Sequence, residues 1–183
     1  KSKIISLLPN PDFIAIILIF IAVILKIYLT FEFSRNYPFY FKPLFGTDMS
    51  AYIKEAGQLI IGNFQSKPFY WNPFYYNFLA VIFYFTDFSI IASVVVQQLL
   101  GLGTLVMIYK LSEKMFNSRV AIISLFLAIL YKQFYFYEQF LLIETTQTFF
   151  LLLFIYYLYS INTFDRIEAI LAGTLFGIQI TVR

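Results

Sequence analysis

The stretch "FIAIILIFIAVILKIYLTF", residues 13–31, decides the fold class. Lys26 is its only charged residue, and as a helix it is long enough to cross a hydrocarbon core of about 30 Å. The run is too long for a cleaved signal peptide, and no small-residue cleavage site follows it. We therefore expect a transmembrane helix, with the amine of Lys26 reaching along the helix to the membrane interface.

The composition extends this interpretation to the whole chain. Of the 183 residues, 61% are hydrophobic and only 13% are charged, against about 25% charged in an ordinary soluble domain. The absence of cysteine and histidine excludes disulfides and the usual zinc sites, so carboxylates must carry any acid, base or metal chemistry. The net charge of +3 is spread along the chain, which argues against a nucleic-acid partner.

Further apolar runs predict an all-α fold, a polytopic transmembrane helix bundle. Four of them should span, namely residues 89–109, 120–135, 140–159 and 169–182. Residues 69–85 are ambiguous, because their first half is rich in Tyr, Trp, Asn and Pro, which is typical of the membrane interface. We expect an external loop of about residues 32–88 that carries juxtamembrane helices.

Lysine and arginine in short loops predict the orientation, because they are retained on the cytoplasmic side. If residues 69–85 lie at the interface, one side holds Lys1, Lys3, Lys110, Lys114, Arg119 and Arg166. Only Lys132 is then left in a short outer loop, in a turn formed by residues 131–139. If residues 69–85 cross fully, the Lys110 to Arg119 cluster moves outside. We prefer the first topology, with a cytoplasmic N-terminus.

The external loop contains "GTDMSAYIKEAGQLIIGN", residues 46–63, which predicts a short helix that ends near Gly62. Asp48 and Tyr52 lie one turn apart on the same side of it. Asp48 could cap the helix by accepting backbone N–H bonds, or it could face a polar site. The two roles are compatible.

Glu144 is the second unusual acidic residue. It lies in "QFLLIETTQTFFLLLF", residues 139–154, at membrane depth, where an ionised group costs about 2.5–3.5 kcal/mol and normally faces a cavity or a partner. Three threonines and a glutamine follow it, which favours a functional role. Alternatively, Glu144 sits at the interface or pairs with Lys132.

Three other features have simpler explanations. Arg183 ends "GIQITVR" and could be a lone arginine that reaches the interface. Gly173 and Gly177 form a ridge of small residues that would let another helix approach closely. Gly101 and Gly103 lack the strand–turn–helix setting of a phosphate loop, so we predict that they serve packing.

Taken in order, the first predicted transmembrane helix and five segments after it resemble a known family. The five segments are "GTDMSAYIKEA" (46–56), "PFYWNPFYYNFL" (68–79), "SEKMFNSRVAIISLFLA" (112–128), "FLLIETTQTFFLLL" (140–153) and "AGTLFGIQITVR" (172–183). Together they resemble the N-terminal half of the GT-C glycosyltransferases, and most closely the protein O-mannosyltransferase and aminoarabinose-transferase-like superfamily. The resemblance implies that residues 1–183 are the N-terminal transmembrane part of such an enzyme, without its C-terminal remainder.

The resemblance also implies site residues. The family's acidic loop residue falls on Asp48, its acidic residue in the fourth helix on Glu144, and its Thr-Arg pair on Val182 and Arg183. Many members have Glu after the loop Asp, but Met49 stands there in this chain, so a two-carboxylate role for the loop is not expected. The family's Pro-Pro is Asn72-Pro73 here.

The implied reaction is transfer of a sugar from a polyprenyl-phosphate donor to an acceptor hydroxyl at the outer or lumenal face of the plasma, inner or endoplasmic reticulum membrane. Asp48 would be the base and Arg183 would stabilise the leaving phosphate. Tyr52 would contact the substrate. Glu144 could orient Arg183, hold the acceptor, or bind a divalent cation with Asp48. Apart from that cation no cofactor is expected, and the acceptor could be a protein, a lipid or a glycan.

Two other functions fit the composition. In a transporter or channel, Asp48 and Glu144 would line a pathway through the membrane. In a non-catalytic membrane subunit, the ridge of Gly173 and Gly177 would be a docking surface. The polar residues lie mostly toward the outer ends of the predicted helices, apart from Gln97 and Gln98, and this favours the transferase.

Overall fold

The computed structural model describes residues 10–63, 73–161 and 165–182, and all regular structure within these ranges is α-helical. The helices are α1 (Pro11–Asn36), α2 (Asp48–Ile60), α3 (Pro73–Phe85), α4 (Ile90–Met115), α5 (Ser118–Leu130), α6 (Lys132–Gln139), α7 (Ile143–Ser160) and α8 (Arg166–Val182). The predicted all-α fold is confirmed.

Two helices of the described chain are long and apolar enough to cross a membrane. These are α1 and α4, each of 26 residues, and α5 with α6 would make a third span if the pair is counted as one broken segment. The 18-residue α7 and the 17-residue α8 do not combine the length and the mean hydropathy that a span requires. The described residues therefore contain two or three candidate spans, fewer than the sequence predicted.

The prediction of one continuous spanning helix over residues 120–135 is wrong. The helix stops at Leu130, and α6 leaves at an angle of 52° to α5. Tyr131, between them, has an extended backbone conformation, with φ −78° and ψ 92°. Residues 131–139, which we expected to form a turn, are mostly helix. The break allows α6 to direct polar side chains inward, where they find partners.

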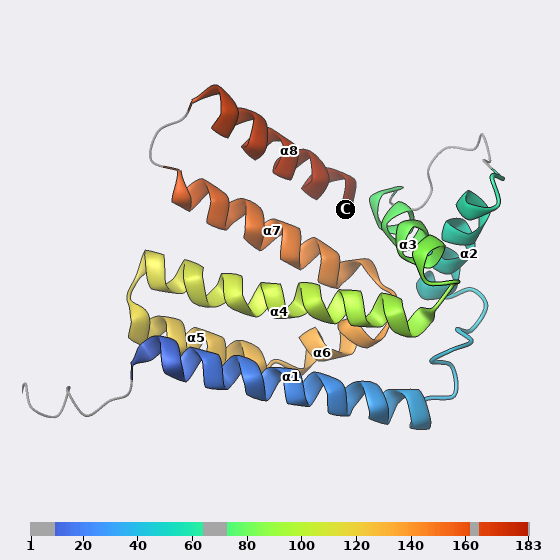
Figure 1. The fold of residues 1–183 in the computed structure, drawn as a ribbon, viewed down its shortest axis with the longest axis horizontal. Coiled ribbons are helices and arrows are strands. Elements are labelled where there is room, and N and C mark those ends of the chain that lie inside the picture. The colour runs from blue at the N-terminus through green and yellow to red at the C-terminus, as the bar shows by residue number, and fades with distance from the viewer. Residues whose placement is uncertain (1–9, 64–72, 162–164, 183) are drawn as a thin grey trace, which may run out of the picture.

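The ambiguous segment ends in a helix too short to span. The 13 residues of α3 extend about 20 Å, well below the thickness of a hydrocarbon core. It packs against α2 at one end of the bundle (Figure 1). Residues 69–72 lie outside the described part of the chain. The structure therefore supports the alternative in which this segment lies at the membrane interface.

The long helices lie side by side, and successive ones run in opposite directions (Figure 1). One end of the bundle holds α2, α3, α6, the start of α7 and the end of α8. We call this the site end. The opposite end holds the α4–α5 connection, the end of α7 and the start of α8. There Lys114 donates to Ser160 at 3.1 Å and Tyr109 donates to Asp12 at 3.0 Å. The basic cluster from Lys110 to Arg119 is thus at the end opposite Asp48, as the charge pattern predicts.

Two apolar clusters stabilise this arrangement. One lies between α1, α4 and α5 and includes Ala22, Leu105, Ala121 and Leu125. The other lies at the site end and joins α2, α3, the start of α4 and the α6–α7 connection through Met49, Tyr52, Leu79, Phe83, Val94 and Leu141. The second cluster fixes α2 and α3 on the bundle.

Candidate functional site

The loop helix α2 begins where the sequence predicts, but Asp48 is not its cap. Thr47 is the N-cap residue, and its hydroxyl accepts the N–H of Ser50 at 3.4 Å. Gly46 precedes it with φ 86°, a left-handed conformation that glycine adopts without strain. The capping interpretation of Asp48 is therefore wrong, and its carboxylate is exposed at the first position of the helix.

Asp48 lines a pocket of about 390 Å³ at the site end. The other lining residues come from the α1–α2 connection, from the start of α2, and from α6 and the segment after it. They are Tyr37, Phe39, Pro43, Leu44, Thr47, Met49, Phe136, Phe140 and Leu142. Among the described lining residues, which are mostly aromatic and apolar, Asp48 is the only one with a carboxylate. We call it the Asp48 pocket.

Tyr52 lies one turn after Asp48 and is only 5% exposed. Its ring packs edge-to-face on the ring of Tyr75, with the centroids 4.8 Å apart. Burial, then the charge of Asp48 and then the charge of Glu144 raise the pKa of Tyr52 to about 12. Asp48 from α2 and Glu144 from α7 thus act on the same phenol, although nearly a hundred residues separate them in the sequence.

Glu144 occupies the first turn of α7, a position where the helix dipole favours a negative charge. No side chain of the described residues caps this helix. Among the described residues, one carboxylate oxygen of Glu144 and the hydroxyls of Thr145 and Thr146 are buried without a hydrogen-bond partner. The alternative that Glu144 pairs with Lys132 is wrong, because the described ion pairs do not include it and Lys132 is exposed.

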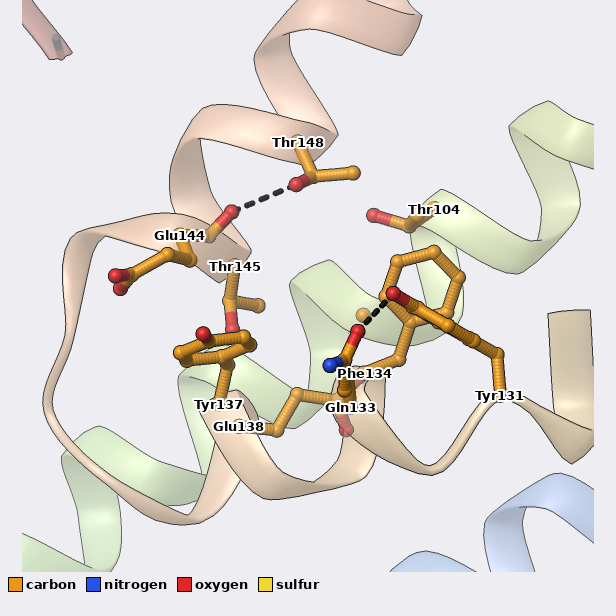
Figure 2. A pocket seen from close by; sticks show the side chains of 10 residues that line it. Thr104, Tyr131, Gln133, Phe134, Tyr137, Glu138, Glu144, Thr145 and Thr148 are labelled. Atoms are coloured by element: carbon orange, nitrogen blue, oxygen red, sulfur yellow. Dashed lines mark hydrogen bonds between the residues drawn. The ribbon is translucent and has the colours of Figure 1, made fainter.

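A second pocket, of about 230 Å³, lies beside Glu144 (Figure 2). Three parts of the bundle line it: α4 with Gly101 and Thr104; the segment around α6 with Tyr131, Gln133, Phe134, Tyr137 and Glu138; and α7 with Glu144, Thr145 and Thr148. Hydroxyl, amide and carboxylate groups are mixed here with aromatic rings. We call it the Glu144 pocket.

The two acidic residues line different pockets, and α6 contributes to both. Phe136 and Phe140, at and after α6, line the Asp48 pocket, whereas Tyr137 and Glu138 line the Glu144 pocket. The position of α6 and the connection that follows it therefore determines the shape of both pockets.

Sequence reasoning missed Glu138, which forms a buried ion pair with Lys26 of α1. The amine also lies 5.0 Å from the ring centroid of Tyr135. The prediction that Lys26 reaches the membrane interface is therefore wrong. The available signal was an acidic residue within the aromatic stretch "FYFYEQF", residues 134–140, which could have been matched to the lysine inside an apolar helix.

The glycines divide into two groups. A Cβ at Gly101 would collide with the carboxylate of Glu138, and one at Gly103 would lie 2.6 Å from the ring of Phe149, so both positions serve close packing as predicted. At Gly173 and Gly177, nothing described lies within 4 Å of such a Cβ. The ridge on α8 therefore has no partner helix within the described chain.

The last two predicted features of the site are Arg183 and a divalent cation. Arg183 lies outside the described residues, although α8 ends beside it at the site end and contacts α3 (Figure 1). In the described ranges, no three acidic side chains come close enough together to hold a metal ion. The divalent cation considered for Asp48 and Glu144 thus lacks a full ligand set in this part of the chain, and we assign it no step.

The chain was compared with known proteins. No characterised protein and no solved structure matches it. A family model described as dolichyl-phosphate-mannose-protein mannosyltransferase matches residues 66–183, which is more than half of the chain. The match includes Glu144, Glu138 and Arg183, whereas Asp48 precedes it. The chain belongs to the dolichyl-phosphate-mannose-protein mannosyltransferase family of membrane glycosyltransferases.

Proposed function

We propose that this protein transfers a sugar from a polyprenyl-phosphate donor to an acceptor hydroxyl, with Asp48 as the base. The observation that carries the proposal is geometric: Asp48 and Glu144 line two pockets at the same end of the bundle, and α6 with the segment after it contributes to both. Membership of a glycosyltransferase family supports the reaction class. In this chain, two acidic residues that are far apart in the sequence lie at the same end of the bundle.

The chemistry requires one proton transfer and one exchange of bonds. The acceptor oxygen forms a bond to the anomeric carbon, while the bond from that carbon to the phosphate oxygen breaks. The hydroxyl proton passes to Asp48, whose carboxylate is exposed and lines a pocket. The polyprenyl phosphate leaves with the bonding electron pair, and Arg183 is our candidate for stabilising its charge.

In this proposal Glu144 contacts the substrate, whereas Tyr52, which is buried and lines neither pocket, acts through its neighbour Asp48. Glu144 has a buried carboxylate oxygen without a partner among the described residues, beside a pocket with several hydroxyl groups. Such a group can accept hydrogen bonds from a sugar or an acceptor. Tyr52 stays protonated at any working pH, because its pKa is about 12, and its phenol therefore keeps its proton beside Asp48.

The direct experiment compares donors in the full-length protein reconstituted in lipid. A radiolabelled sugar should pass to an acceptor from polyprenyl phosphate, and the corresponding nucleotide sugar should give no transfer. The same vesicles report transport of the free sugar or of ions. Transport without transfer would replace the proposal with the transporter alternative. Neither activity, in a folded protein, would favour the non-catalytic subunit.

We further propose that the N-terminus is cytoplasmic and the site end is external or lumenal. Lys110 and Lys114 lie in the last turns of α4 and Arg119 in the first turn of α5, and these two helix ends lie at the end of the bundle opposite the site end, which supports this orientation. Residues 1–183 contain no cysteine, so single cysteines at Lys54 and Lys114 can be labelled specifically once any cysteine elsewhere in the full-length protein has been replaced. An impermeant reagent should reach position 54 in intact vesicles or cells and position 114 only after permeabilisation. Labelling of both from one side contradicts this topology.

A further inference from the structure

Gln97 of α4 lies at the junction of the elements that form the candidate site. Its side chain is fully buried. Its amide nitrogen donates to the carbonyl oxygens of Phe140 at 3.1 Å and Leu142 at 3.3 Å, and its amide oxygen accepts the phenol of Tyr75 at 2.9 Å. Carbonyl oxygens can only accept, so the orientation of the amide is fixed by its partners.

We propose that Gln97 is a positioning residue, which holds the α6–α7 connection and α3 so that Asp48 and Glu144 face one substrate. This inference rests on the proposed function. Gln97 itself lines neither pocket, so it acts through the backbone and through Tyr75.

The first part of the argument concerns the connection between the pockets. Phe140 and Leu142, whose carbonyls Gln97 binds, both line the Asp48 pocket. Glu144 follows two residues later at the start of α7. The carbonyl of Tyr137, which lines the Glu144 pocket, lies 3.5 Å from the same nitrogen. One amide group thus fixes backbone that contributes to both pockets.

The second part concerns the external helices. Tyr75 on α3 is fully buried and donates to Gln97, and its ring packs edge-to-face on Tyr52 of α2. Tyr52 lies one turn from Asp48. The path from Gln97 through Tyr75 to Tyr52 therefore links α4, α3 and α2. Loss of the amide would leave the buried phenol of Tyr75 without its acceptor and would remove a donor from the carbonyls of Phe140 and Leu142. The carbonyl of Phe140 would keep only the N–H of Leu142, 2.8 Å away, and this loss favours rearrangement of the segments that carry these groups.

Gln98 provides a matched control. It is the next residue of α4, is 8% exposed, and donates its amide N–H to the hydroxyl of Thr30 on α1. It lines neither pocket and does not bind the α6–α7 connection. Replacement of Gln98 therefore removes a buried amide hydrogen bond from the same helix without releasing the candidate site.

The experiment uses the full-length protein with Gln97→Leu, Gln97→Glu and Gln98→Leu. Cysteines at Lys54 on α2 and Lys132 on α6, both exposed, carry spin labels for a distance measurement. For Gln97→Leu we expect a broadened or shifted distance distribution and a fall in kcat of about tenfold or more. Buried against carbonyl oxygens, the carboxyl group of Gln97→Glu should be protonated, so it keeps the acceptor for Tyr75 and one O–H donor in place of two N–H donors, and the same change should be smaller. Gln98→Leu should keep the distances and kcat of the unsubstituted protein.

If Gln97→Leu and Gln98→Leu alter kcat and the distances equally, or if Gln97→Leu keeps the original distances, the inference is overturned. Should Gln97→Leu not fold, Tyr75→Phe, which removes one hydrogen bond, is measured in its place, with a smaller shift expected. The distance measurement does not require activity. An inactive unsubstituted protein would thus overturn the proposed function, while the distances still decide the role of Gln97.

Discussion

The amine of Lys26 and the carboxylate of Glu138 form an ion pair inside the helix bundle, 112 residues apart in the sequence and with both side chains only 3% exposed. The pair joins α1 to α6 and lies against Gly101 of α4. Each charge is compensated by the other, which is the condition for tolerating ionised groups away from water. It therefore fixes α6, the helix that contributes to both pockets.

Removal of one partner of the Lys26–Glu138 pair should lower the stability of the protein more than removal of both. Lys26→Met leaves a buried carboxylate without its cation, and we expect a loss of about 3–5 kcal/mol in unfolding free energy. Lys26→Met with Glu138→Met should recover most of it. Thermal unfolding in detergent measures both. Lys110→Met, which removes an exposed amine 3.6 Å from Glu113, is the control and should change stability by about 1 kcal/mol at most. A double variant as unstable as Lys26→Met would contradict this account.

Two glycine-to-alanine substitutions should have opposite effects. At Gly101 the added methyl group would collide with the carboxylate of Glu138 and lie 3.0 Å from the amine of Lys26, so we expect a loss of about 1–3 kcal/mol. At Gly173 nothing described lies within 4 Å, so alanine should be neutral or stabilise the helix by up to about 1 kcal/mol. Melting temperatures of the two variants give the comparison. Equal stability of Gly101→Ala and the unsubstituted protein would mean that the close approach of α4 and α6 is not as described.

Tyr52 should report the charge of Asp48. Its pKa of about 12 is raised first by burial and then by Asp48, so Asp48→Asn should lower the pKa while leaving it above the ordinary value near 10. Carbon-13 NMR of ring-labelled tyrosine measures it, with Tyr52→Phe to assign the signal. An unchanged pKa in Asp48→Asn would show that the carboxylate is not close to the phenol.

The same shift predicts a dependence of stability on pH. The folded state binds the Tyr52 proton more tightly than the unfolded state does. The contribution of this proton to the free energy of unfolding is therefore complete below pH 10 and is lost as the pH rises through about 12. Stability should therefore fall across this window, and less steeply in Tyr52→Phe. Equal slopes for the two proteins would contradict the raised pKa.

Local apolar runs made part of the fold predictable. The run at residues 13–31 predicted α1 because hydropathy over one continuous helix is a property of the sequence alone. The distribution of lysine and arginine among the short loops predicted that Asp48 and Glu144 lie at the same end of the bundle, because successive spanning helices alternate in direction. The start of α2 was predicted within one residue, although Thr47 and not Asp48 supplies the cap.

Features that depend on distant partners were not predictable in this way. A lysine near the end of an apolar helix normally reaches the interface, and only the fold places Glu138 against Lys26. The break at Tyr131 is hidden because hydropathy averaged over residues 120–135 does not register a bend. Gln97 was noted as polar, but its role depends on carbonyl groups more than forty residues away.

The most direct test of the central claim is the transfer rate of Asp48→Asn in the full-length protein, measured in a single turnover from a polyprenyl-phosphate-linked sugar. Glu55→Gln is the matched control, because it neutralises a carboxylate on the same helix that lines neither pocket. We predict that Asp48→Asn lowers the rate about 100-fold or more without loss of folding, and that Glu55→Gln keeps the original rate. Transfer by Asp48→Asn at the rate of the unsubstituted protein would contradict the assignment of Asp48 as the base.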